Sequence, residues 1–274
     1  MLRSAYHGMT KVEKRIANYI MLNPETVMDM TIPALAQAVS SSEITVSRFC
    51  KKLGFNGLQS LKIALAADLR QMRADGYPEI RPGDSYETVT AKVFQSIADG
   101  LSDTQKLLDF RAAEKAVDIL IKARRIAVYG FGNSATVCRD IETRFLRFGM
   151  VVQAYSDSHQ QVTSASLLTS NDAVIAVSHT GATSELLTST RLARANGARV
   201  IAITSHAASP LTKEADVVLV GMGREVHYCS EAAASRLVHM AMVDVLYTGI
   251  AMRMPDQYQE NLHRMRKAIA EKRV

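Results

Sequence analysis

The spacing of apolar residues changes once along the chain, and the change predicts two domains. Up to about residue 75 the apolar positions recur every three or four residues, which is typical of helices. Beyond that point a long helical stretch is followed by short β-branched runs that alternate with further helical stretches. Between the two patterns the sequence GYPEIRPGDS holds two prolines and two glycines, which favours a linker. We therefore expect domains at 1–75 and 87–274, joined by a linker at 76–86.

The first segment predicts four helices. Thr10 with Glu13 three residues on forms a capping box, and Asn23-Pro24 closes the helix that it starts. A second helix over TIPALAQAV has Thr31 as its cap, and a third follows with Ser42 as its cap. Gly54 suits a left-handed residue after the third helix, and the fourth covers about 57–73.

The second and third helices fit a helix-turn-helix in which the third is the recognition helix. Leu35, Val39, Val46 and Phe49 would form the shared core. Short polar and basic side chains would then face outward, as reading of base edges and phosphates in a major groove requires: Ser41, Ser42, Glu43, Thr45, Ser47, Arg48, Lys51 and Lys52. Residues 1–75 hold ten Lys/Arg and six Asp/Glu, a net charge of +4. The alternative is a helical hairpin with a solvated polar face. Ser40 stands where many such turns have glycine, so either this serine adopts a less comfortable backbone conformation or the turn differs slightly.

The second segment predicts a five-stranded, mostly parallel, doubly wound sheet of the α/β class. The runs IAVYG, VVQAY, AVIAVS, RVIAIT and DVVLVG are apolar on both faces, as strands covered by helices must be. Ligands of such sheets bind beyond the carboxyl ends of the strands, where the strand order switches.

Two loops that follow strands carry suitable chemistry. The first has Gly130 and Gly132, which let the backbone approach a ligand, and then Asn133 and Ser134 at a helix start. It lacks the third glycine of a dinucleotide fingerprint, and no acidic residue ends the next strand, so NAD is disfavoured. The chain has no P-loop motif either.

The second loop lies in VSHTGATSE, which follows a buried strand. Ser178, Thr180 and Thr183 can donate hydrogen bonds to phosphate oxygens, and Gly181 permits the close turn beside His179. A helix N-terminus adds unpaired N–H groups and a partial positive charge. Helix capping is the alternative role, although one hydroxyl would be enough for it. The residues favour an anion site.

Composition narrows the remaining possibilities. The chain has 274 residues, 47% hydrophobic and 22% charged, with a net charge of +6. No apolar run is long enough to span a bilayer and the start lacks a signal peptide, so we expect a cytoplasmic protein without membrane contact. Three dispersed cysteines and scattered histidines predict no disulfide framework and no metal site. We expect no cofactor.

At these residues the chain resembles a known family. Ser178–Thr183 matches the S-x-[ST]-G-x-[ST] grip of the sugar isomerase (SIS) domain, and Ser134 matches the serine of its first loop. KLGFNGLQSLKIAL resembles the signature of RpiR-type regulators, with Leu58 in place of a frequent aromatic residue. The resemblance implies a transcriptional regulator that binds double-stranded operator DNA and responds to a sugar phosphate. By position alone, Glu231 stands near the catalytic glutamate of related isomerases, and we include it among the candidate ligand contacts.

The alternative function is a sugar-phosphate isomerase with a non-catalytic helical domain. It would need a general base, for which His159, His179, Glu185 and Glu231 are the candidates, but no convincing acid–base pair emerges. We therefore expect a sensor and not an enzyme, working as a homodimer or homotetramer. The helices predicted at 87–109 and in RLVHMAMVDVLYTGIAM could form oligomer surfaces or simply cover the sheet.

Overall fold

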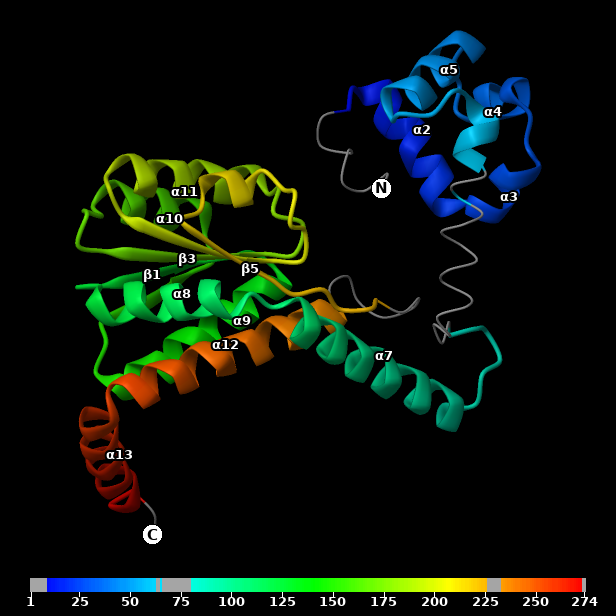
Figure 1. Cartoon of the computed structure of the whole chain (residues 1–274). Helices are drawn as coiled ribbons and strands as arrows, with labels where there is room; N and C mark the ends of the chain where they lie inside the picture. The colour runs from blue at the N-terminus through cyan, green and yellow to red at the C-terminus, as the bar shows by residue number, and fades with distance from the viewer. Residues whose placement is uncertain (1–8, 63–64, 66–79, 226–232, 273–274) are drawn as a thin grey trace. The chain divides into compact units, whose positions relative to one another are not determined.

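The structure is a computed structural model that describes residues 9–62, 65, 80–225 and 233–272. The chain divides into two compact units, residues 1–77 and 78–274 (Figure 1). Each is described here by itself.

The first unit is helical throughout its described part. Its helices are α2 (Lys11–Leu22), α3 (Pro24–Asp29), α4 (Ile32–Ala38) and α5 (Glu43–Lys52), with further helical residues at 58–62. Leu35, Val39, Val46 and Phe49 are all buried in one cluster, as the sequence predicts.

The caps of these helices follow the sequence. Thr10 and Glu13 form the predicted capping box, while Thr31 and Ser42 cap α4 and α5. Ser40 has a φ of +47°, the strained conformation that is one of the two expected alternatives, and its carbonyl accepts a hydrogen bond from Arg15 at 2.7 Å. Helix α3 was not predicted, because Pro24 was interpreted only as the end of α2. It is also a good first helical residue, and here it starts a helix.

The second unit contains a five-stranded sheet with all neighbouring strands parallel, which confirms the predicted fold class. The strands are β1 (Ile126–Tyr129), β2 (Val152–Tyr155), β3 (Ala173–Ser178), β4 (Arg199–Thr204) and β5 (Val217–Val220). Their spatial order is β2-β1-β3-β4-β5. Strand order therefore switches between β1 and β3, where a doubly wound sheet binds its ligand.

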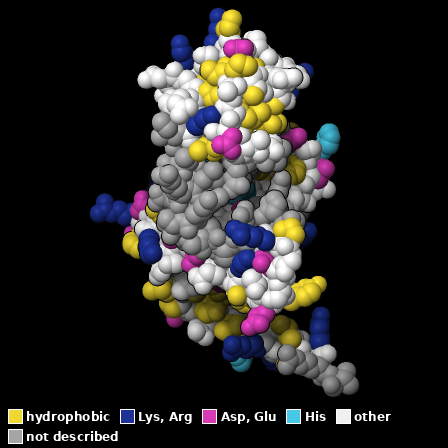
Figure 2. Space-filling view, turned by 90° about the vertical axis from the view of Figure 1, so that its right-hand side faces the viewer, with side chains coloured by type: hydrophobic (Ala, Val, Ile, Leu, Met, Phe, Trp, Pro, Cys, Tyr) yellow, Lys and Arg dark blue, Asp and Glu magenta, His cyan; other side chains and the backbone are white. Residues whose placement is uncertain are grey.

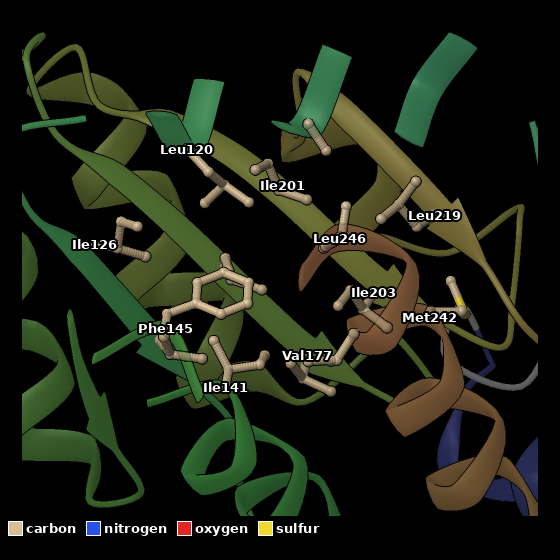
Figure 3. Packing of buried hydrophobic residues seen from close by; sticks show 14 of the residues in the cluster. Leu120, Ile126, Ile141, Phe145, Val177, Ile201, Ile203, Leu219, Met242 and Leu246 are labelled. Atoms are coloured by element: carbon tan, nitrogen blue, oxygen red, sulfur yellow. The ribbon is translucent and has the colours of Figure 1, made fainter. Parts of the chain in front are cut away.

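Helices cover both faces of this sheet. On one face lie α8 (Phe110–Lys122), α9 (Asn133–Phe145) and α12 (Ala233–Arg253), and on the other α10 (Ser158–Ser166) and α11 (Ser184–Ala195) (Figure 1). Figure 3 shows the core of the first face, where Phe145 of α9 and Leu246 of α12 lie among Ile126, Val177 and Ile201 from three strands. Short 3-10 turns occur at Leu146–Phe148 and Leu211–Glu214.

Two further helices lie outside these layers. Helix α7 (Tyr86–Leu107) packs on α12, with Gly100 next to Val238, and also buries Ser96 and Thr104, while Phe94 is 71% exposed. Helix α12 covers the sheet, which was one of the two roles expected of it. Helix α13 (Pro255–Ala270) ends the described chain and has no buried residue. Within the described residues, no single helix could span a membrane by length and apolarity; α12 and α13 pass such a test only together, as a pair bent by 107°.

Among the residues that the structure describes, Cys50 in α5 and Cys138 in α9 are free and buried, one in each unit. Burial raises the pKa of Cys50 to about 11 and also raises the pKa of Cys138.

Basic side chains lie at separate points of the face drawn in Figure 2, so the coloured atoms of that view form no continuous basic patch.

Candidate effector site and recognition helix

Two loops leave adjacent strands at the same edge of the sheet. The glycine loop (residues 130–134) follows β1, and the hydroxyl loop (residues 178–183) begins in the last residue of β3. Because β1 and β3 pair in parallel, with Tyr129 beside Ala176, both loops lie at the switch in strand order. The topology therefore brings the two predicted halves of the site to one place.

The glycine loop is shaped by two glycines with different tasks. Gly132 has φ +53° and ψ −128°, a combination that side chains disfavour, and α9 begins directly after it without a side-chain cap. A Cβ on Gly130 would lie 2.6 Å from the Sγ of Cys138, so this glycine allows close packing of α9 on β1. Asn133 and Ser134 are the first two residues of α9 and are half-buried. Helix α9 therefore follows an N-cap residue that has no side chain.

The hydroxyl loop holds its side chains in place with its own backbone. Ser178 Oγ accepts a hydrogen bond from Gly181 N–H at 3.0 Å, and Thr180 Oγ1 accepts one from Ala182 N–H at 3.3 Å. A hydroxyl that accepts a backbone bond keeps its own proton for donation. Ser178 and Thr180 are thus oriented to donate, as contact with a phosphate oxygen requires.

These hydroxyls do not cap the helix that follows. Thr183 is the N-cap of α11 but makes no side-chain capping bond; its Oγ1 lies 3.5 Å from Ser178 Oγ instead. Thr183 thus leaves the first turn of α11 without an N-cap bond, although the Glu185 carboxylate accepts from its own backbone N–H, and the positive end of the helix dipole faces the loop. Capping therefore does not account for the three hydroxyls.

Gly181 fixes the path of the hydroxyl loop. Its φ is +62°, and a Cβ there would lie 2.6 Å from the Cβ of Ser209 and would also collide with the Ser209 hydroxyl. Its carbonyl accepts a hydrogen bond from Leu211 N–H at 2.9 Å, which ties the loop to the segment that follows β4. Both the conformation and the lack of space require glycine.

His179 joins the hydroxyl loop to a buried hydrogen-bond network. Its Nδ1 lies 3.0 Å from Ser205 Oγ, and Ser205 donates to the carbonyl of Gly221 at 2.8 Å. The Nε2 of His239, on α12, lies 3.1 Å from both that hydroxyl and that carbonyl. The ring of His206 packs edge-on against His179 at 5.4 Å between centroids. Sequence spacing does not predict the parts played by Ser205 and His239, since no local pattern links them to His179, 26 and 60 positions earlier.

Burial keeps His239 neutral. Burial, the largest cause, and the nearby charge of His179 lower the pKa of His239 to about 4 against the opposing effects of Gly221 and Glu225. A neutral imidazole can donate a hydrogen bond through one ring nitrogen, and its burial does not require the desolvation of a charge. The network from His179 to α12 is therefore uncharged at its buried end.

The segment after β5 continues the connection to α7. Met222 N–H donates to Thr104 Oγ1 at 3.2 Å, and Ser96 donates to the carbonyl of Arg224. Arg224 forms ion pairs with Asp99 and Asp103 of the same helix at 3.4 and 2.6 Å. An unbroken chain of contacts thus runs from His179 through Ser205 and Gly221 to α7.

The candidate bases that an isomerase would need, other than His179, are either exposed or outside the described residues. Glu231 lies outside the described residues. Glu185 is exposed, and its hydrogen bond from Ser184 at 2.7 Å lowers its pKa, which weakens it as a base. His159 is exposed on α10.

Helix α5 and the turn before it present the residues predicted to contact DNA in two groups. Glu43, Arg48 and Lys51 are exposed, and Ser41 and Ser47 are partly so. Ser42 and Thr45, by contrast, bond to each other at 2.8 Å, with Ser42 capping α5.

Lys52 has a structural partner. Its Nζ lies 2.8 Å from Glu13 Oε2 and 2.9 Å from Oε1, which joins the end of α5 to the capping box of α2. The pair lowers the pKa of Glu13. Lys52 therefore has a bond inside this unit that sequence spacing could not reveal, because its partner is 39 residues away.

Comparisons with known proteins place both units. Residues 1–72 match the helix-turn-helix domain of the rpiR family, and residues 119–249 match the SIS domain. The HTH-type transcriptional regulator HexR of Pseudomonas aeruginosa is 36% identical over 98% of this chain and 94% of its own length. The chain belongs to the RpiR family of transcriptional regulators.

Two further relatives show how the RpiR architecture is used. The bifunctional protein glk of Burkholderia thailandensis is 36% identical over 92% of this chain, but the match spans only 39% of that longer protein. The NanR protein of Vibrio vulnificus, solved in complex with ManNAc-6P, has a TM-score of 0.66 and 29% identity, with coverage of 100% of this chain and 98% of that one. The order of units in this chain is thus that of RpiR regulators, and the match leaves the rest of glk outside it.

Proposed function

We propose that this regulator binds operator DNA through α5 and that a phosphorylated sugar, held between the glycine and hydroxyl loops, sets its affinity for that DNA. The observation that carries the proposal is the pair of helix N-termini, α9 and α11, which begin without side-chain caps at one switch point beside oriented hydroxyls. Backbone N–H groups, hydroxyl protons and two helix dipoles together suit a phosphate dianion.

The same geometry suggests how the ligand acts at a distance. A phosphate that draws on Ser178 and Thr180 must alter the bonds that hold the hydroxyl loop, of which His179 is part. His179 bonds to Ser205, and the network continues through Gly221 to α7. Helix α7 starts the second unit just after the segment that joins it to the first. Ligand binding would bias two arrangements of this network, and the regulator would work as a homodimer that reads two half-sites.

Sensing is favoured over isomerisation. Catalysis would need a base of suitable pKa beside the sugar, whereas Glu185 is exposed with a lowered pKa and His179 is engaged by Ser205. In a sensor, the bond between His179 and Ser205 transmits whether ligand is bound between the loops, so this bond serves the function.

One experiment tests both halves of the proposal. Full-length protein would select duplexes from a random-sequence DNA pool, and fluorescence anisotropy would then measure affinity with and without a panel of aldose and ketose phosphates that includes ManNAc-6P. Inorganic phosphate serves as the control ligand. We expect one sugar phosphate to change DNA affinity by about 5- to 150-fold, the usual range of allosteric coupling.

Two matched variants test effector binding and DNA binding separately. Ser178→Ala with Thr180→Ala should abolish the response to ligand but keep DNA binding. Arg48→Ala should weaken DNA binding but keep the rise in melting temperature that the ligand causes. Turnover of a sugar phosphate by the purified protein would instead support the isomerase alternative.

A further inference from the structure

Helix α5 carries an apolar side chain where a solvated surface would have a polar one. Ile44 is 66% exposed, and it is the one large apolar side chain more than a third exposed among those described in residues 9–62. The remaining large apolar residues of that helix, Val46 and Phe49, are buried. Exposure of Ile44 therefore does not follow from a loosely packed unit.

The position of Ile44 on the helix is equally specific. An α-helix turns by about 100° per residue, so residues 44, 48 and 51 lie opposite the buried Val46, Phe49 and Cys50. Ile44 thus shares the centre of the outer face with Arg48 and Lys51, two exposed cations suited to phosphate. A groove-facing helix points this side at the bases.

The surroundings of Ile44 leave room for a base edge. Ile44 lines an open hollow between the start of α5 and α4, together with Pro33, Ala36 and Glu43. Ser42 and Thr45, next to it in sequence, are occupied with each other at 2.8 Å and with the cap. Of the groups at the start of α5, Ile44 offers apolar surface, and the thymine 5-methyl is the apolar feature of a major groove.

We infer that Ile44 reads a thymine by packing against its 5-methyl group, which makes it a specificity-determining residue of the recognition helix. The inference rests on the proposed function, because it requires α5 to enter the major groove. Ile44 supplies no hydrogen bond. It excludes water from the methyl group and discriminates against base pairs that present a polar or smaller edge at that place.

A cycle of four affinities tests the inference. Wild-type protein and Ile44→Ala would be measured on the duplex selected by the wild type and on copies in which each thymine in turn is replaced by deoxyuridine, which removes only the methyl group. We expect one thymine per half-site at which the replacement weakens wild-type binding about fourfold, the equivalent of one buried methyl group. Ile44→Ala should weaken binding to the thymine duplex by a similar factor and lose all sensitivity to the replacement.

The controls and the contrary outcomes distinguish a failure of the role of Ile44 from a failure of the proposed function. Ile44→Val should retain sensitivity to the methyl group, and Asn18→Ala, at an exposed position of α2, should retain it fully; the melting temperature verifies that each variant is folded. If every deoxyuridine replacement affects Ile44→Ala as much as wild type, the role of Ile44 is overturned while DNA binding stands. If the pool yields no specific duplex, the proposed function fails, and this inference fails with it.

Discussion

Gly181 shows how one residue determines the shape of the candidate site. It combines a φ of +62° with a lack of space for any side chain, since Ser209 lies directly beside its Cα. These two constraints make different contributions, because left-handed backbone costs an alanine energy wherever it occurs, whereas the collision depends on the neighbour.

Gly181→Ala should lower the free energy of unfolding by about 2–4 kcal/mol, the sum of a strained conformation and an overpacked contact. Urea denaturation measures it. The double variant Gly181→Ala with Ser209→Gly removes the neighbouring side chain and should recover the steric part only. Full recovery would show that the backbone conformation imposes no cost of its own.

His239 makes stability depend on pH. Its pKa is about 4 when folded and 6.5 when unfolded, so between these values the unfolded chain binds a proton that the folded chain does not. Its contribution is therefore complete above pH 6.5 and is lost as the pH falls towards 4, by up to about 3 kcal/mol.

His239→Gln should flatten this dependence of the free energy of unfolding between pH 6.5 and 4. The measurement is denaturation at several pH values, and His159→Gln, at an exposed histidine, is the control that should leave the slope unchanged. An unaltered slope in His239→Gln would show that other groups cause the acid sensitivity.

At the scale of elements, α7 lies at the far end of the chain of contacts that starts at His179. It touches the segment after β5 closely at Gly100, where a Cβ would lie 3.1 Å from Gly223 Cα and 3.2 Å from Arg224 N. Helix α7 can thus stay near this segment only while residue 100 is small.

Gly100→Leu should push α7 away from the segment, lower the free energy of unfolding by about 1–3 kcal/mol and reduce the response of DNA binding to ligand, with sugar-phosphate affinity nearly unchanged. Anisotropy and calorimetry measure the two affinities. Ala98→Leu makes a similar enlargement on an exposed position of the same helix and should change neither. An intact response in Gly100→Leu would exclude α7 as the route.

Elements were predictable where their signals are local. Thr10 and Ser42 mark helix starts through bonds three residues away, and buried strands such as AVIAVS show continuous apolar runs. The Ser205–His239 network and the pair of Lys52 with Glu13 depend on partners 34 and 39 residues apart, which spacing does not encode. The exposure of Ile44 was also hidden, because sequence alone assigns an isoleucine to the core.

The whole molecule combines the binding of DNA with the binding of a sugar phosphate. Thermodynamic linkage requires each of these equilibria to affect the other. If sugar phosphate changes DNA affinity by some factor, operator DNA must change sugar-phosphate affinity by the same factor. Neither unit needs to be known in detail for this equality to hold.

Calorimetric titration of the effector into free protein and into protein saturated with the selected duplex should give dissociation constants that differ by the factor seen in DNA binding. The Ser178→Ala, Thr180→Ala variant should show no such difference. Unequal factors would indicate that a further equilibrium, such as a change of oligomeric state, takes part.

Cys50 and Cys138, the buried cysteines of the described residues, allow the opening of each unit to be followed separately. A thiol reacts with alkylating reagents as the thiolate, and the raised pKa values and burial of Cys50 and Cys138 suppress that form in the folded protein. Each becomes reactive only when its own surroundings come apart. Pulsed alkylation read by peptide mass spectrometry would therefore report how often the DNA-reading unit and the sheet unit unfold, without any label being engineered into the chain.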